Sequence, residues 1–123
     1  MKFRHIAAAL LALCCLTACK SSQVDEEIYN CGESVIRAVD AYMDNKATYD
    51  ETNKKIEGLY KQVETWCDEH SDAENQAYNF AVRIQINSLD FELYKESLGD
   101  STYADVLEKR NKLAEEIGYP TRD

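Results

Sequence analysis

The stretch Ser71–Gly99, SDAENQAYNFAVRIQINSLDFELYKESLG, decides the fold, because it predicts a long helix around which the rest of the chain is organised. Its apolar residues form two stripes, which lie on opposite sides of a helix that turns about 100° per residue. The first stripe consists of Ala73, Ala77, Phe80, Ala81, Ile84, Phe91, Tyr94 and Leu98. The second stripe consists of Tyr78, Val82, Ile86, Leu89 and Leu93. A surface helix needs only one stripe, so either the chain covers both sides of this helix or the second stripe binds another molecule.

Three further helical segments are predicted from their end signals. Capping boxes are expected at three helix starts, namely Ser22 with Asp25, Thr48 with Glu51, and Ser71 with Glu74. The last helix is expected to be capped by Ser101 or Thr102, and the expected helix ends are Asp44 or Asn45, His70, Gly99 and Gly118. No segment alternates as a strand does, and the connections are short. We therefore expect an all-α, up-and-down four-helix bundle over residues 24–123.

The first residues have the pattern of an export signal. Lys2 and Arg4 are followed by the apolar run Ile6–Leu16, which is too short for a membrane span of about 20 residues. The run ends in Leu16-Thr17-Ala18-Cys19, which resembles the lipobox of bacterial lipoproteins. The alternative is an ordinary signal peptide in which a cysteine occurs by chance. The resemblance covers residues 1–19 and does not extend to the domain that follows.

The resemblance to bacterial lipoproteins implies a signal peptide over residues 1–18 and a membrane anchor at Cys19. In that class the cysteine thiol receives a diacylglycerol and the new amino group is acylated, and several acyl chains hold a protein stably on a bilayer. Lys20 stands where an Asp would signal inner-membrane retention, so the resemblance implies the outer membrane, facing the periplasm. Residues 19–23 form a tether that reaches about 14 Å when extended.

The composition is strongly acidic. Loss of Lys2 and Arg4 with the signal peptide takes the formal net charge from −9 to −11. This charge disfavours nucleic acid and anionic headgroups, and it favours basic proteins, cationic peptides or metal ions as partners. The plainer interpretation is that acidity keeps an exported protein soluble.

The cysteine pattern predicts a disulfide. Cys14 and Cys15 leave with the signal peptide, and Cys19 is the lipid site, so Cys31 and Cys67 remain. An even pair in an oxidising compartment is most simply a disulfide. Both lie on the apolar stripe of their helix at equal distances from Tyr49, so an antiparallel hairpin would bring them together. Closing this loop would stabilise the fold by about 3–4 kcal/mol.

Candidate catalytic residues are scarce. His70 is the only histidine after signal cleavage, and no phosphate loop, nucleophile–base pair or haem-attachment motif is present. We expect no catalytic residues, no metal and no cofactor. The alternative is a small-ligand or divalent-metal site in the acidic turn around His70, made of Asp68, His70, Asp72 and Glu74. This set matches no established ligand spacing.

Arg110 lies in the middle of the inward stripe of the last helix, between Leu107 and Leu113. Three interpretations stay open: its stem covers the core while its head reaches water, it pairs with a carboxylate of a neighbouring helix, or it anchors a ligand. The tyrosines at four positions are either bundle-edge residues or a contact surface, namely Tyr29, Tyr49, Tyr60 and Tyr78.

These features predict a non-enzymatic, protein-binding lipoprotein of the bacterial envelope. In the preferred hypothesis, the second stripe of the third helix docks a protein partner or a second copy of the chain. In the equally supported alternative, the other three helices cover both stripes. The acidic charge suggests an inhibitor or immunity protein against a basic enzyme that attacks the envelope. The alternative class is the ligand or metal carrier that uses the turn around His70.

Overall fold

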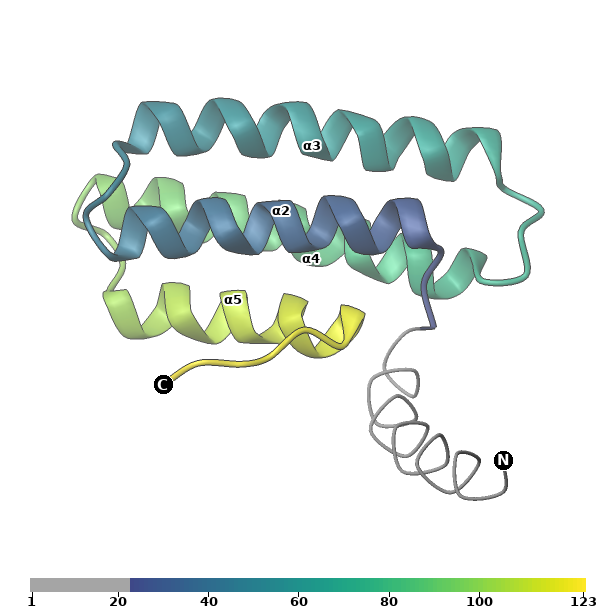
Figure 1. The fold of residues 1–123 in the computed structure, drawn as a ribbon. Coiled ribbons are helices and arrows are strands. Elements are labelled where there is room, and N and C mark those ends of the chain that lie inside the picture. Colours follow the sequence, from purple (N-terminus) through teal and green to yellow (C-terminus); the bar gives the residue numbers. More distant parts are fainter. Residues whose placement is uncertain (1–22) are drawn as a thin grey trace, which may run out of the picture.

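The computed structural model describes residues 23–123, which form four helices packed side by side (Figure 1). The helices are α2 (Glu26–Met43), α3 (Tyr49–Glu69), α4 (Gln76–Ser97) and α5 (Tyr103–Ile117). Short connections make successive helices antiparallel, and the described residues contain no strand. The prediction of an all-α fold with four helices is confirmed. Within residues 23–123, no helix is long and apolar enough to cross a bilayer.

Several predicted helix ends are confirmed. The Thr48 side chain accepts a hydrogen bond from the Glu51 backbone, and Glu51 accepts one in return from the Thr48 backbone at 2.8 Å. Thr102 caps α5 by accepting from the backbone of Asp105 at 3.1 Å. Gly99 and Gly118 both have a φ of 81°, which lies in the left-handed region that ends helices and favours glycine.

Two predicted helix starts are wrong. α4 begins at Gln76 rather than after Ser71, because successive turns occupy the chain between His70 and Gln76. α2 begins at Glu26, and Ser22 lies outside the described residues. Asp25 is the N-cap residue of α2, but its side chain does not cap its own helix. Its carboxylate instead accepts hydrogen bonds from Asn79 in α4 and from Asn75, the residue before α4.

α4 is a corner of the bundle. It packs closely against α3 and α5, whereas its contact with α2, which lies diagonally across, is small. In Figure 1, α4 lies behind α2, between α3 and α5. The core is formed by apolar side chains of all four helices, including Ile28, Val35, Ile36, Val39, Ile56, Val63, Val82, Ile86, Leu89, Leu93, Val106, Leu113 and Ile117. A corner helix therefore buries one face in the core and leaves the opposite face outside.

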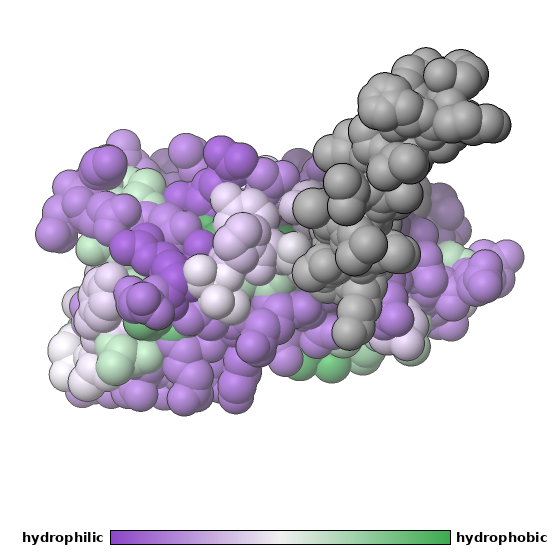
Figure 2. All heavy atoms as spheres, turned by 60° about the horizontal axis from the view of Figure 1, so that its bottom comes forward, coloured by the Kyte–Doolittle hydropathy of each residue, from purple (hydrophilic) through white to green (hydrophobic). Residues whose placement is uncertain are grey.

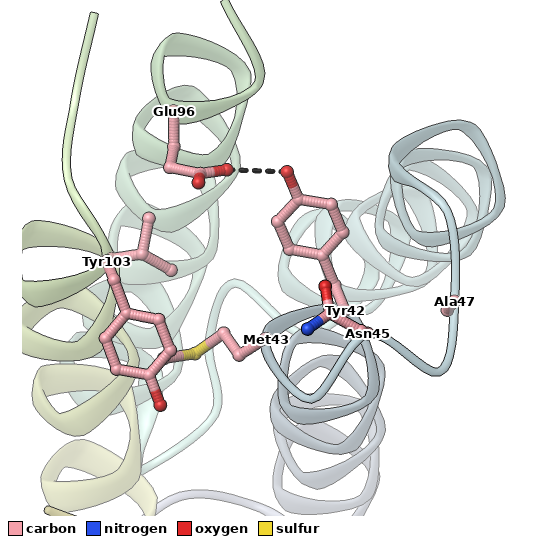
Figure 3. A pocket seen from close by; sticks show the side chains of 7 residues that line it. Tyr42, Met43, Asn45, Ala47, Glu96 and Tyr103 are labelled. Atoms are coloured by element: carbon pink, nitrogen blue, oxygen red, sulfur yellow. Dashed lines mark hydrogen bonds between the residues drawn. The ribbon is translucent and has the colours of Figure 1, made fainter. Parts of the chain in front are cut away.

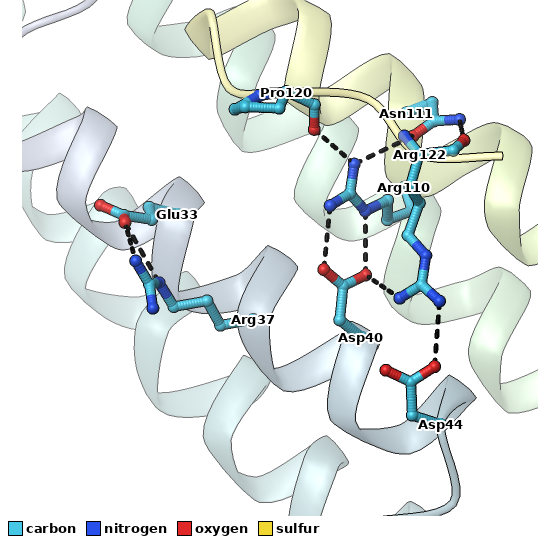
Figure 4. Close-up of polar contacts among 8 residues, drawn as sticks. All are labelled: Glu33, Arg37, Asp40, Asp44, Arg110, Asn111, Pro120 and Arg122. Carbon is cyan, nitrogen blue, oxygen red and sulfur yellow. Dashed lines mark hydrogen bonds and ion pairs between the residues drawn. The ribbon is translucent and has the colours of Figure 1, made fainter.

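Arg110 joins α5 to α2 in a buried ion pair (Figure 4). Its guanidinium donates two hydrogen bonds of 2.9 Å to the carboxylate of Asp40 and one of 2.7 Å to the carbonyl of Pro120. Arg122 contacts the same carboxylate at 3.1 Å and Asp44 at 2.9 Å. Of the three interpretations of Arg110, pairing with a carboxylate of a neighbouring helix is confirmed. The pair also fixes the C-terminal segment against α2.

The predicted Cys31–Cys67 disulfide is wrong, because both cysteines are free. The turn between α2 and α3 is centred near Lys46 and not at Tyr49, so the neighbour of Cys31 across the hairpin is Gln62. Cys67 lies a further five residues along α3, which is about 7.5 Å at 1.5 Å per residue. That offset, added to the spacing between two helices, exceeds the Cα separation of about 7 Å that a disulfide allows.

Candidate functional site

The inner face of α4 is part of the core. Val82, Ile86, Leu89 and Leu93 have no exposed surface, whereas Tyr78 is 43% exposed at the edge of the same stripe. The prediction that this stripe forms a docking surface is wrong for the four buried residues. Their stripe faces the bundle interior, where α3, α5 and α2 close over it, so no partner can reach it in the folded domain.

The outer face of α4 carries the first stripe, and this stripe is exposed. Among the described residues, seven large hydrophobic side chains are exposed, and five lie here at 49% to 60% exposure: Phe80, Ile84, Phe91, Tyr94 and Leu98. By contrast, the α5 side of the bundle is covered mainly by hydrophilic residues (Figure 2). A stripe of this size on one face is typical of an interaction surface.

Cations flank the outer face of α4. The guanidinium of Arg83 lies 5.6 Å from the ring of Phe80, and Lys95 Nζ lies 5.2 Å from the ring of Phe91. Of the three carboxylates of α4, Glu92 bonds Ser101 and pairs with Lys95 at 3.2 Å, Glu96 bonds Tyr42, and Asp90 is half-buried beside α3. Arg83 pairs with Glu64 at 2.9 Å, so both cations beside the outer face are already paired with carboxylates of the single chain.

The start of the described chain is fixed to the start of α4. Asn79 donates a 2.8 Å hydrogen bond to the Asp25 carboxylate and accepts one of 3.0 Å from the Asp25 backbone, and Asn75 donates another to the carboxylate. These bonds lower the pKa of Asp25, with the Asn79 bond as the largest cause. Sequence reasoning missed this contact, although a polar Asn79 between apolar Tyr78 and Val82 was a signal.

The turn around His70 does not form a cluster of ligands. The His70 ring stacks on Trp66 with 3.7 Å between ring centroids, and its Nδ1 lies 3.0 Å from the Trp66 carbonyl oxygen. Within residues 23–123, no three His, Cys, Asp or Glu side chains come together in a way that could hold a metal ion. Asp68, Asp72 and Glu74 therefore do not converge with His70 on one point.

A hollow lies at the end of the bundle where α2 connects to α3 and α4 connects to α5, and it has a volume of about 240 Å³. It is lined by Tyr42, Met43, Asn45, Ala47, Glu96, Tyr103 and Val106. Figure 3 shows the Tyr42 hydroxyl pointing at Glu96, to which it donates a hydrogen bond of 2.5 Å. Burial and the neighbouring carboxylate raise the pKa of Tyr42 to about 12, so the phenol stays protonated at neutral pH. The lining contains neither histidine nor cysteine, and its one carboxylate, that of Glu96, is engaged by Tyr42.

The other tyrosines and the cysteines have structural surroundings. Tyr29, Tyr49 and Tyr60 are half-buried and pack against the core, which is the bundle-edge interpretation. Burial raises the pKa of the Cys31 thiol to about 11, so it is protonated and unreactive at neutral pH.

Comparison with known proteins finds no family model, no curated protein and no solved structure that matches this chain. The candidate functional site therefore depends on the geometry alone. It is the outer face of α4.

Proposed function

We propose that this chain is a lipid-anchored lipoprotein of the bacterial envelope, and that its folded domain is a non-enzymatic module that binds protein through the outer face of α4. The anchor would be Cys19, which lies outside the described residues, and the outer membrane facing the periplasm is the proposed location. The observation that carries the proposal is the row of five exposed apolar side chains on one helix face.

The outer face of α4 is exposed to solvent in the single bundle. Each large apolar side chain that leaves water contributes roughly 1.5–3 kcal/mol when fully buried, so a partner that covers this row gains a substantial free energy. Aromatic residues make up three of the five, and aromatic side chains are enriched where proteins meet. A helix is the partner shape that fits an exposed helix face.

The hypothesis of an inhibitor or immunity protein depends on a different feature, the net negative charge. A basic enzyme would be attracted to the acidic residues of α2 and α3, and not to the apolar outer face of α4. It stays a second proposal, and its complex should dissociate as salt is raised, because screening weakens charge-led association.

The experiment compares two variants of the full chain in its membrane. Phe91→Glu places a charge in the exposed row, and Ser34→Glu adds the same charge on the exposed side of α2, diagonally opposite. We expect chemical crosslinking in native membranes to give a complex for the wild type and for Ser34→Glu, but none for Phe91→Glu. Both variants should unfold within about 0.5 kcal/mol of the wild type, because both positions are exposed. A complex that survives in folded Phe91→Glu would contradict the proposal.

A further inference from the structure

The outer face of α4 has the spacing of a coiled-coil seam. Its members follow one another at alternating steps of four and three residues, in the order Phe80, Ile84, Asn87, Phe91, Tyr94 and Leu98. This is the heptad pattern with d positions at 80, 87 and 94 and a positions at 84, 91 and 98. An amphipathic helix of a globular protein needs a broader apolar face than this, so the narrow row is typical of helix pairing.

Asn87 distinguishes the possible orientations of such a pair, because it is the only polar residue of the seam. In a parallel pair of identical helices, Asn87 meets Asn87 of the second copy, and two side-chain amides can donate to and accept from each other. In an antiparallel pair, Asn87 would meet Phe91 and lose its partner. Parallel coiled coils use a single Asn at an a position to fix register. Asn87 occupies a d position of this seam, where residues of the two copies also meet.

The charges beside the seam favour the same orientation. In a parallel pair, a g position faces the e position five residues further along the other helix, which places Asp90 beside Lys95 of the second copy. An antiparallel pair would instead bring Asp90 close to Asp90 of the second copy, and like charges repel.

Asp90 also lacks a partner in the single chain. Its Oδ1 is buried without a hydrogen-bond partner among the described residues, and burial raises the pKa of its carboxyl. It lines a hollow of about 180 Å³ between α3 and α4, together with Glu57, Lys61, Glu64 and Asn87. Lys61 lines the same hollow without a hydrogen bond to Asp90 Oδ1. An ammonium group that enters this hollow from the second copy would satisfy a half-buried acid that the monomer leaves unsatisfied.

The membrane tether adds a geometric argument. The contact of Asp25 with Asn79 fixes the start of the described chain beside the first turn of α4, and an extended tether from Cys19 to Gln23 reaches about 14 Å. A parallel pair brings both tethers to the same end. An antiparallel pair would separate them by the length of α4, which is about 33 Å for 22 residues.

We infer that the partner of the outer face is a second copy of this chain, and that two membrane-anchored bundles pair in parallel along α4. The occupant of the seam is thus α4 of the second copy, with Asn87 against Asn87 and Asp90 beside Lys95. This inference rests on the proposed function of the outer face. It adds the identity and the orientation of the partner.

The test uses cysteine crosslinking of the full lipidated chain in phospholipid vesicles. We expect mild oxidation of Asn87→Cys to give a disulfide-linked species of twice the chain mass, and Phe91→Glu in the same chain to abolish it. All variants carry Cys67→Ser, because Cys67 is free, half-exposed and lines a hollow together with Phe80. In that background, Ser34→Cys, at an exposed position of α2, should stay monomeric, as should the parent chain, whose Cys31 is buried. Lys95→Glu should weaken pairing about three- to tenfold, because the two Asp90–Lys95 ion pairs between the copies are lost.

Four outcomes would overturn the inference. A crosslink between Phe80→Cys and Leu98→Cys chains, with none for Asn87→Cys, would show antiparallel pairing. Unchanged pairing of Lys95→Glu would contradict the parallel register. Failure of Asn87→Cys to crosslink, while wild-type membranes still give a complex with another protein that Phe91→Glu removes, would refute self-pairing and leave the proposed function standing. Absence of every complex would refute both.

Discussion

The two faces of α4 are both apolar, yet one is sealed in the core and the other is half exposed. The inner face consists of compact aliphatic residues, namely Val82, Ile86, Leu89 and Leu93, each with no exposed surface. Aromatic residues dominate the outer face, where cations lie beside two of the rings. Hydrophobicity alone does not separate the two faces. Branched aliphatic side chains fill a close-packed interior. Aromatic rings that contact cations can stay exposed in the single bundle and become buried when a partner binds.

The largest expected effect contrasts one residue from each face. Leu89→Ala should lower the free energy of unfolding by about 2–5 kcal/mol, because it leaves a cavity in a packed core. Phe91→Ala removes a larger side chain, yet it should change that free energy by less than about 0.5 kcal/mol, because the ring is exposed in the single bundle. Urea denaturation of both variants, at a protein concentration low enough to avoid association, measures the difference. Comparable losses for the two variants would refute the assignment of the faces.

The second effect concerns the polar contact at the start of α4. Asn79 is only 2% exposed, and its side chain makes two hydrogen bonds to Asp25. Asn79→Ala should lower the free energy of unfolding by about 1–3 kcal/mol, because the half-buried Asp25 loses both hydrogen bonds to Asn79 and keeps the one from Asn75. Asn87→Ala, at an exposed Asn two turns further along the same helix, is the matched control and should have little effect on the monomer.

The same contact predicts a pH dependence. The pKa of Asp25 is lowered from its ordinary value of 3.8 in the folded chain, chiefly by the Asn79 hydrogen bond. A lowered folded pKa gives stability that is present above the unfolded pKa and is lost as pH falls through the folded pKa. The gap in unfolding free energy between wild type and Asn79→Ala should therefore narrow when denaturation is repeated below pH 3.8. A gap that stays constant would separate the role of Asn79 from the charge of Asp25.

The sequence predicts the elements well, because the relevant signals are local. The capping box of Thr48 and the left-handed glycines 99 and 118 are decided by a few neighbouring residues. The start of α4 is not local in this sense. Ser71 with Glu74 has the composition of a capping box, but the chain enters α4 only at Gln76, next to the contacts that Asn75 and Asn79 make with Asp25.

The choice of the buried face of α4 could not be predicted for a similar reason. Both stripes have helical spacing, and the one that faces inward is set by the direction in which α3 and α5 pack around the corner helix. The ion pairing of Arg110 was easier to predict, because a charged residue inside an apolar stripe must be paired. The sequence did not indicate that Asp40 would be the carboxylate. The prediction of a Cys31–Cys67 disulfide failed because the turn between α2 and α3 lies three residues earlier than expected, which moves Cys67 past Cys31 along the hairpin.

The smallest expected effect is that of a reducing agent. The inner face of α4 is held by packing and by hydrogen bonds, without a covalent crosslink, because Cys31 and Cys67 are free. Dithiothreitol should therefore change the free energy of unfolding by less than about 0.5 kcal/mol, whereas breaking a disulfide in this loop would cost about 3–4 kcal/mol. Thiol titration in denaturant, without reductant, should find both cysteines reactive. A loss of stability on reduction would mean that α3 lies further along α2 than the Cys31–Gln62 contact places it, and the packing of α3 on the inner face of α4 would shift with it.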